Sequence, residues 1–174
     1  MERIIVDALS LTLSLGAQQF PCVIGKGGWC AADDKREGDG RTPLGLWPVS
    51  GVLLRPGRIS LTEALKLPWR WTRKQDGWSD DPADPQYNRP VMLPHGFSAE
   101  TLQRDDHAYD VIVVLGHNDA PPVPGRGSAI FFHIWNPCAD GAPNATEGCV
   151  AIDGAAMLSI LQLLRPGMLM EIRA

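Results

Sequence analysis

The chain has 174 residues, a length that fits one domain with a proper hydrophobic core. Its formal net charge of −4 argues against nucleic acid as a partner, because a phosphate-binding surface carries a basic excess, and no apolar run approaches the length of a membrane span. Glycine (18) and proline (15) are frequent, which favours a loop-rich β architecture.

The N-terminus lacks the features of a secretory signal. The stretch Met1–Asp7 contains two acids, no basic n-region and no uninterrupted apolar h-region. We therefore expect a cytosolic protein with no membrane partner. In that compartment cysteines are usually free thiols, and their spacing here matches no zinc site, so we expect no metal and no other cofactor. The four cysteines are Cys22, Cys30, Cys138 and Cys149.

The first third of the chain predicts an antiparallel meander. Residues 3–6, 11–15 and 20–24 alternate apolar and polar side chains or form short apolar runs, as half-buried strands do. Pro21 indicates an edge position or a strand start. The glycine-rich segment 25–28 lacks the spacing of a P-loop and predicts a turn, and the charged run 33–39 predicts a solvated loop.

The middle of the chain is less regular. Residues 46–54 predict a strand, and Ser60 or Thr62 is a candidate cap for a short helical turn over Glu63–Leu65 that ends by Pro68. The aromatic stretch 69–88 has no clear period and is interpreted as a loop packed on the sheet. The alternative for this stretch, which ends in Tyr87 and Asn88, is a wall of a substrate cleft.

Residues 109–115 form a continuous apolar run and predict a central strand. His117 follows this strand, either as a hydrogen-bonded loop histidine or as a member of a cleft.

The last third of the chain alternates strands with one helix. Residues 131–135 and 149–152 predict two buried strands joined by a polar loop. Asp153 is a good N-cap for a helix over 154–164, whose buried face repeats at i, i+3, i+4 and i+7, and residues 168–172 predict a last strand.

One of the two buried runs contains His133 and the other contains Cys149, preceded by Gly148. An imidazole within hydrogen-bond reach is the usual means of generating a cysteine thiolate near neutral pH. Gly148 lets the backbone approach a substrate carbonyl and present N–H groups to an oxyanion. A buried cysteine in an apolar run is also ordinary core, so both interpretations stay open on these residues alone.

Three motifs together resemble the YkuD-type L,D-transpeptidase family of peptidoglycan enzymes. They are the segment 38–45 with Thr42-Pro43-Leu44-Gly45, the segment 125–133 that leads to His133, and the Thr146-x-Gly148-Cys149 element. They occur in family order. The resemblance implies a mostly β fold with one or two helices, a sandwich or barrel-like catalytic domain spanning residues 1–174. It makes Cys149 the nucleophile and His133 its base.

Two positions depart from the family pattern. Glu147 stands where the family usually has a second histidine, and Ala151 stands where arginine or asparagine is usual. Glu147 either orients His133 or a water, or caps the turn. The nucleophile and base of the family pattern are retained, whereas the two departures leave the identity of the substrate and of the acceptor open.

By the resemblance, Cys149 attacks the carbonyl on the L side of an L,D-peptide bond in a muropeptide stem and forms a thioester. Thr146, Glu147, Tyr87, Asn88 and His117 are candidate substrate-binding residues. The terminal carboxylate calls for an arginine fork, for which Arg126 is the first choice and Arg41 the second; the alternative for both is a charge facing solvent.

The acceptor decides the activity. Cross-linked peptidoglycan is not cytosolic, so we expect water as acceptor and an L,D-carboxypeptidase that removes D-alanine from muropeptide tetrapeptides during recycling. The alternatives are an L,D-transpeptidase, for cross-linking or D-amino-acid exchange, and a non-catalytic muropeptide-binding domain. An active thiolate is expected to be acylated by carbapenem-type inhibitors.

Overall fold

The computed structural model describes residues 2–61 and 63–174. Within these residues the fold is mostly β, with a single α-helix, α1 (Gly154–Leu161), and two short 3-10 turns, η1 (Ala32–Asp34) and η2 (Ala108–Asp110). The strands are β1 (Arg3–Asp7), β2 (Thr12–Leu15), β3 (Gln18–Val23), β4 (Trp29–Cys30), β5 (Thr42–Pro43), β6 (Gly45–Leu54), β7 (Trp69–Trp71), β8 (Asp76–Ser79), β9 (Pro90–Met92), β10 (Ala99–Thr101), β11 (Val111–Leu115), β12 (Phe131–Ile134), β13 (Val150–Ile152) and β14 (Leu169–Arg173).

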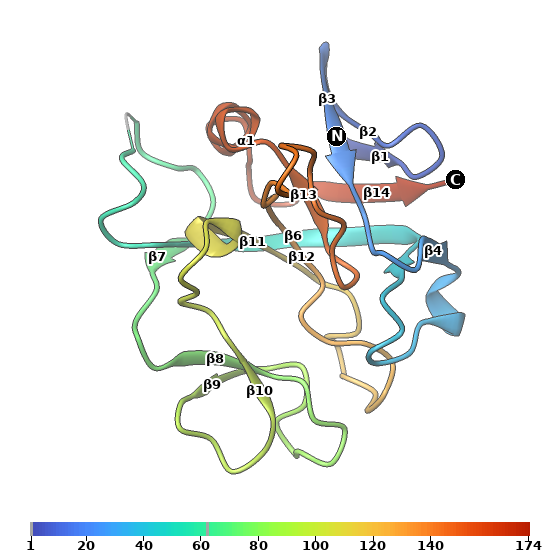
Figure 1. Ribbon diagram of the computed structural model, residues 1–174, viewed down its shortest axis with the longest axis vertical. Coiled ribbons are helices and arrows are strands. Elements are labelled where there is room, and N and C mark those ends of the chain that lie inside the picture. Colours follow the sequence, from blue (N-terminus) through green and yellow to red (C-terminus); the bar gives the residue numbers. More distant parts are fainter. Residues whose placement is uncertain (1, 62) are drawn as a thin grey trace.

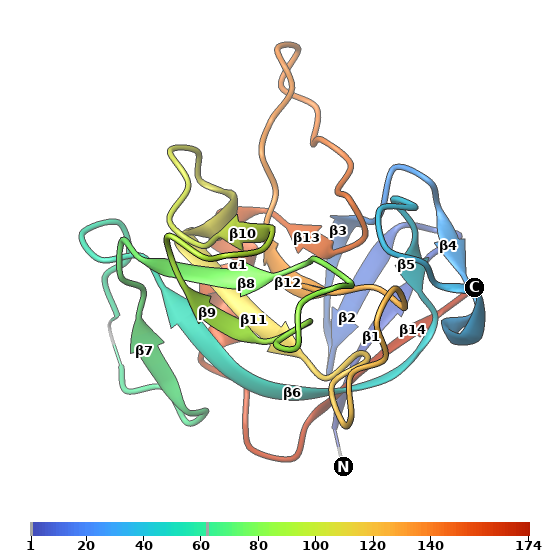
Figure 2. The same cartoon turned by 90° about the horizontal axis from the view of Figure 1, so that it is seen from below.

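The main sheet closes on itself as a barrel. Its strand order is β11-β12-β13-β3-β2-β1-β14-β6-β7, and β6 pairs in addition with β11, which closes the barrel between these two strands and leaves β7 as an extension beside β6. The long strand β6 curves across the molecule in Figure 2 and makes this closure possible, because its first half pairs with β14 and its second half with β11. The pairs β1–β14 and β12–β13 are parallel. The expected mostly β, barrel-like fold is confirmed.

A second, smaller sheet of order β10-β8-β9 lies apart from the barrel, at the lower end of the molecule in Figure 1. Of its strands, β8 lies in the aromatic stretch 69–88 that was predicted to be a loop, whereas β9 and β10 follow that stretch. The loop prediction was wrong at β7, which pairs with β6, and at β8, because strands of three and four residues show too little alternation to be recognised in the sequence.

The strands that carry the candidate site are buried on both faces. Alternate residues of β12 and β13 face different apolar clusters: Phe132 and Val150 belong to the barrel interior, whereas Phe131 and Cys149 belong to a second cluster. This second cluster includes Trp78 of the small sheet. Two covered faces explain why the sequence shows continuous apolar runs here rather than alternation.

The meander over β1, β2 and β3 and the central position of β11 are confirmed. Pro21 lies in β3 just beyond the last pairing with β13, where one side of the strand has no neighbour in the described sheet.

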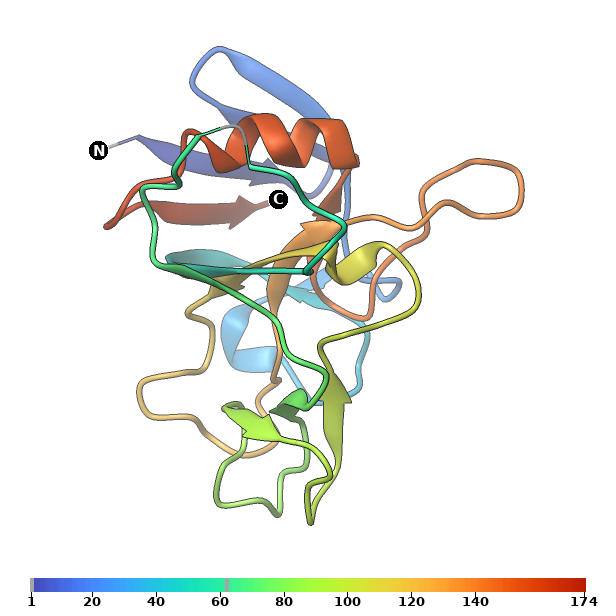
Figure 3. The ribbon, with the colours of Figure 1, turned by 90° about the vertical axis from the view of Figure 1, so that its left-hand side faces the viewer.

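Helix α1 begins as expected, with the Asp153 carboxylate accepting from the Ala155 and Ala156 N–H groups. It packs its apolar face on the barrel interior (Figure 3) and ends at Leu161, short of the predicted Leu164. Among the described residues, no helix has the length and apolar character needed to cross a bilayer.

Two local predictions differ from the structure. The expected helical turn over Glu63–Leu65 is absent from the described residues, which form bends and irregular chain there; Thr62, its alternative cap, lies outside them. The charged run 33–39 is not uniformly solvated, because Lys35 is only 2% exposed.

Candidate active site

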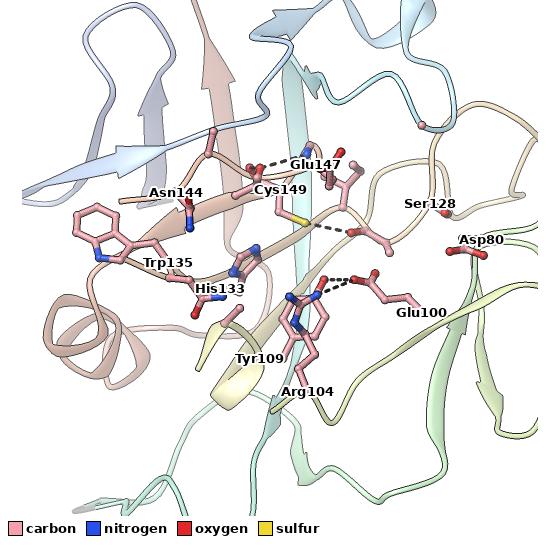
Figure 4. A pocket seen from close by; sticks show the side chains of 18 of the residues that line it. Asp80, Glu100, Arg104, Tyr109, Ser128, His133, Trp135, Asn144, Glu147 and Cys149 are labelled. Atoms are coloured by element: carbon pink, nitrogen blue, oxygen red, sulfur yellow. Dashed lines mark hydrogen bonds and ion pairs between the residues drawn. The ribbon is translucent and has the colours of Figure 1, made fainter. Parts of the chain in front are cut away.

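His133 of β12 and Cys149, which directly precedes β13, lie on one face of the sheet. In the parallel register of β12 and β13, Phe132 lies opposite Val150 and His133 lies opposite Ala151. Cys149 is therefore two residues before the residue opposite His133. Side chains two residues apart in a strand share a face, which puts the thiol and the imidazole on the same side. Both line a pocket of about 490 Å³, and Figure 4 shows the imidazole beside the sulfur.

The Cys149 side chain is 7% exposed and hydrogen-bonded at rest. Its thiol donates to the Ala129 carbonyl at 3.2 Å and its sulfur accepts from the Phe131 N–H at 3.3 Å; among the described residues His133 is not one of its partners. Burial, reinforced by the charge of Glu100, raises the pKa of the thiol to about 12, although the Phe131 N–H acts in the opposite direction. At rest, Cys149 is therefore a neutral thiol.

The His133 ring has a defined tautomer. Its Nδ1 lies 2.7 Å from the Ile134 carbonyl oxygen, which can only accept, so Nδ1 carries the proton and Nε2 has the free lone pair. Burial lowers the pKa of His133 to about 4. The Tyr109 ring packs against the imidazole edge to face, with centroids 5.2 Å apart. The neutral ring is thus oriented to accept a proton on Nε2.

The backbone conformation directly before Cys149 requires a glycine. Gly148 has φ +143°, and a Cβ added there would stand 2.9 Å from the Arg41 carbonyl oxygen. Its own N–H donates to the Thr146 hydroxyl at 3.1 Å, and that hydroxyl donates to the Cys149 carbonyl at 2.7 Å. The Gly148 N–H is therefore already engaged, contrary to its expected role toward an oxyanion.

The Thr42-Pro43 segment supports this loop from the other side. The fully buried Thr42 hydroxyl accepts from the Gly25 N–H at 2.8 Å and donates to the Gly148 carbonyl at 2.8 Å. A single hydroxyl thus connects two loops to the backbone that presents Cys149.

The other predicted residues fall into two groups. Thr146 and Glu147 line the pocket, but the Glu147 carboxylate pairs with Lys26 at 2.7 Å, and both side chains are largely exposed. Glu147 therefore does not orient His133. The second group, which lies outside the pocket, comprises Tyr87, Asn88, His117, Arg126 and Arg41.

Arg126 is not positioned as a fork for a substrate carboxylate, because its guanidinium donates to the Asp33 carbonyl. Arg41 is exposed, as its alternative interpretation held. The His117 ring is buried against Trp47 with Nε2 3.0 Å from the Arg126 carbonyl oxygen, which agrees with a hydrogen-bonded loop histidine rather than a cleft residue.

Asn88 acts on the site indirectly, through a residue that contacts Cys149. Its side-chain oxygen accepts from the Ala129 N–H at 3.1 Å and from the Trp78 indole at 2.8 Å, and its amide donates to the Asn118 carbonyl at 2.6 Å. Ala129 has φ 51°, unusual for a residue with a side chain, and its carbonyl is the acceptor of the Cys149 thiol. Tyr87 similarly supports the pocket wall by donating to Glu37.

The sequence did not indicate several pocket residues. They are Lys35, Glu37, Asp80, Glu100, Arg104, Tyr109 and Ser128. Most lie in loops or in strands that were not predicted.

Two cations line the pocket. The Arg104 guanidinium stacks over the Tyr109 ring at 5.2 Å and binds the Asp106 carboxylate, with Nε 3.0 Å from Oδ1. The Lys35 ammonium pairs with Asp39 and donates to the Arg36 carbonyl at 3.1 Å. Within residues 2–61 and 63–174, no group of three or more His, Cys, Asp or Glu side chains is arranged to hold a metal ion.

Comparison with known proteins gives three results. The family model described as the YkuD L,D-transpeptidase catalytic domain matches residues 3–172. A solved structure of an L,D-transpeptidase from Mycobacterium smegmatis is similar, with a TM-score of 0.46 and 12% identity over 99% of this chain and 58% of that chain. The chain thus spans little more than half the length of that protein. No curated protein sequence matches. On the extent of the family match, the chain belongs to the YkuD family of L,D-transpeptidase catalytic domains.

Proposed function

We propose that this chain is a cysteine enzyme that cleaves L,D-peptide bonds in muropeptide stems through a thioester. The observation that carries the proposal is the shared face of β12 and β13, which presents a thiol and a neutral imidazole to the same pocket. These are the two groups that nucleophilic catalysis by cysteine needs.

The bonds change in a defined order. The Cys149 thiol proton passes to His133 Nε2 as the sulfur attacks the carbonyl carbon on the L side of the scissile bond. The C–N bond then breaks, and His133 returns the proton to the nitrogen of the leaving D-amino acid. In the second half, His133 takes a proton from water, the hydroxyl oxygen adds to the thioester carbonyl, and the sulfur leaves and is reprotonated.

The developing oxyanion needs donors other than the Gly148 N–H. The Lys35 ammonium is close, since its Nζ lies 3.6 Å from the position that a Cβ on Gly148 would take. It is 2% exposed, so its charge acts with little screening by water. In the proposal, the Cys149 N–H and Lys35 stabilise the oxyanion.

The terminal carboxylate of the substrate is assigned to Arg104. It lines the pocket, whereas Arg126 does not, and its side chain is 40% exposed. Its pairing with Asp106 holds the guanidinium in place without enclosing it, so that further N–H donors are free to meet a carboxylate.

Water is the acceptor in this proposal, which makes the enzyme an L,D-carboxypeptidase of cytosolic muropeptide recycling. All four cysteines are free thiols, the state that a reducing compartment maintains, and this supports the location. Transfer to an amine, as cross-linking or D-amino-acid exchange, uses the same acyl-enzyme and is the alternative outcome.

A second candidate function is a non-catalytic muropeptide-binding domain. It is favoured by the resting geometry of Cys149, whose thiol is buried, has a raised pKa and is hydrogen-bonded to Ala129 rather than to His133. Catalysis ranks first because Cys149 and His133 both line the pocket.

The test combines two measurements by mass spectrometry on the purified chain. With muropeptide tetrapeptide, loss of one alanine by hydrolysis supports the carboxypeptidase, whereas dimers or exchanged termini show transfer. With a carbapenem, an adduct on Cys149 that is absent in Cys149→Ala supports the nucleophile. No turnover and no adduct would favour the binding domain.

A further inference from the structure

One wall of the pocket is acidic. Glu37, Asp80 and Glu100 line it together with Ser128, and each of the four comes from a different part of the chain. In the view of Figure 4, Asp80, Glu100 and Ser128 lie on one side of Cys149, and His133 and Trp135 lie on the other. The fold therefore gathers three carboxylates beside the proposed reaction centre.

These groups have unused capacity to accept hydrogen bonds. Tyr87 donates to Glu37, and the Tyr109 hydroxyl donates to Glu100 at 2.6 Å, but one Asp80 carboxylate oxygen is buried and has no partner among the described residues. The Ser128 hydroxyl is likewise without a partner in the described chain, in a residue that is only 7% exposed. A buried acceptor or hydroxyl of this kind is normally paired with protein, ordered water or a ligand, so where it lines a pocket it is available to a ligand group that displaces water.

The cations of the pocket do not fill this need. Lys35 is paired with Asp39, and Arg104 is paired with Asp106 and, at 4.0 Å, with Glu100, but neither cation pairs with Asp80 or Glu37 among the described residues. Burial raises the pKa of Glu100, and the charges of Asp80 and Glu37 act in the same direction, which indicates like charges close together in a poorly solvated place. An additional positive charge at this wall would relieve that repulsion.

We propose that Asp80, Glu100, Glu37 and Ser128 form a subsite for an alkylammonium group of the substrate. The inference rests on the proposed function for the identity of that substrate. An ammonium has three N–H donors and no acceptor, which suits a wall built from carboxylate oxygens and a hydroxyl. A substrate with a neutral group in this place leaves the acceptors unpaired and is discriminated against.

Two sources share this chemistry. One is the side-chain amine of the diamino acid whose carbonyl Cys149 attacks, and the other is the amine of an acceptor molecule. In the first case the charge belongs to the acyl donor, and in the second it belongs to a separate molecule. Binding of peptide variants tests the first source, and binding of free amines tests the second.

The test measures binding to the full Cys149→Ala chain, so that no reaction takes place during the titration. The probes are a muropeptide tetrapeptide with its side-chain amine free, the same peptide with that amine acetylated, and D-alaninamide as a small amine. We expect acetylation to weaken binding by about 10- to 100-fold, the range for a charge-assisted hydrogen bond in a desolvated site. If acetylation does not change the affinity of the peptide but D-alaninamide binds, the same subsite lies on the acceptor side.

Charge-removing variants locate the effect. In Asp80→Asn and in Glu100→Gln, each added to Cys149→Ala, the preference for the free amine is expected to shrink or vanish. Asp105→Asn removes an exposed acid that does not line the pocket, and it is expected to keep the full preference. The acetylation comparison uses an unaltered pocket wall, so it remains decisive even where a variant folds poorly.

Equal affinity for both peptides together with no binding of D-alaninamide would overturn the subsite. The proposed function is judged separately, by acylation of Cys149 in the wild-type chain with a carbapenem that has no amine. An adduct without amine preference refutes the subsite and leaves the enzyme, whereas amine preference without any adduct or turnover refutes the enzyme and leaves the subsite.

Discussion

The pH dependence of Cys149 acylation tests whether His133 is a base. The thiol has a pKa of about 12 and the imidazole a pKa of about 4, so both groups are neutral over a wide range around pH 7. At pH 7, a thiol with this pKa is ionised in only about one molecule in 10⁵. A pre-formed thiolate is thus too rare to account for efficient attack, and a general base has to take the proton during the step.

The two mechanisms give different profiles. If His133 Nε2 accepts the thiol proton, the reactive form is the neutral pair, and the acylation rate is expected to be flat from about pH 5.5 to 9.5. In His133→Gln the reaction depends on free thiolate instead. Its rate is expected to fall by about 10²–10⁴ at pH 7 and to rise about tenfold for each pH unit.

The assay follows adduct formation with a carbapenem by mass at each pH, with excess reagent and single-exponential fits. His107→Gln is the matched control, because His107 is exposed, pairs with Asp110 and does not line the pocket. A wild-type rate that itself rises tenfold per pH unit, overlaid by that of His133→Gln, would refute the base.

Three further predictions concern stability, each measured as the free energy of unfolding in denaturant. Gly148→Ala is expected to cost about 1–3 kcal/mol, because its φ of +143° suits glycine and the new Cβ meets the Arg41 carbonyl oxygen at 2.9 Å; an unchanged midpoint would contradict this. Thr42→Val is expected to cost about 1–3 kcal/mol through the lost bonds to Gly25 and Gly148, and Thr42→Ser, which keeps the hydroxyl, to cost much less. The pKa of His133 is lowered to about 4 in the folded chain, so at pH 5 the imidazole is protonated in the unfolded chain and neutral in the folded chain. The free energy of unfolding is therefore expected to be about 2 kcal/mol lower at pH 5 than at pH 8. This component is expected to be missing from His133→Gln, and an identical pH profile in that variant would exclude it.

The predictability of the fold follows from where apolar residues lie. Strands β1, β2, β3, β6, β11, β12, β13 and β14 and the start of α1 were predicted, because they belong to the barrel and their hydrophobic patterns report its two covered faces. The short strands β8, β9 and β10 were not, since three- and four-residue strands that pair locally leave almost no periodic signal.

The candidate site shows the same division. Cys149 and His133 were found because they lie in buried runs and in a family motif, and the structure places both in the pocket. The acidic wall could not be found, because Glu37, Asp80 and Glu100 come from separate loops and strands that are brought together only by the tertiary fold. The arginine assignment failed for a related reason: closeness to His133 in sequence favoured Arg126, whereas the chain path brings Arg104 to the pocket.

If Cys149 is the nucleophile, as proposed, its resting contacts would couple its ionisation to attack on the substrate. Asn88 accepts a hydrogen bond from the Ala129 N–H and so holds Ala129 at φ 51°. In that conformation the Ala129 carbonyl oxygen accepts a hydrogen bond from the Cys149 thiol, with 3.2 Å between oxygen and sulfur. If the thiol lost its proton before attack, a buried thiolate would face the Ala129 carbonyl oxygen. The negative sulfur and the partly negative oxygen would repel each other without water to solvate them. Attack on a substrate carbonyl removes the negative charge from the sulfur as it forms. In the proposed mechanism, this arrangement would favour proton transfer to His133 in the same step as sulfur–carbon bond formation, and it would keep the thiol unreactive between turnovers.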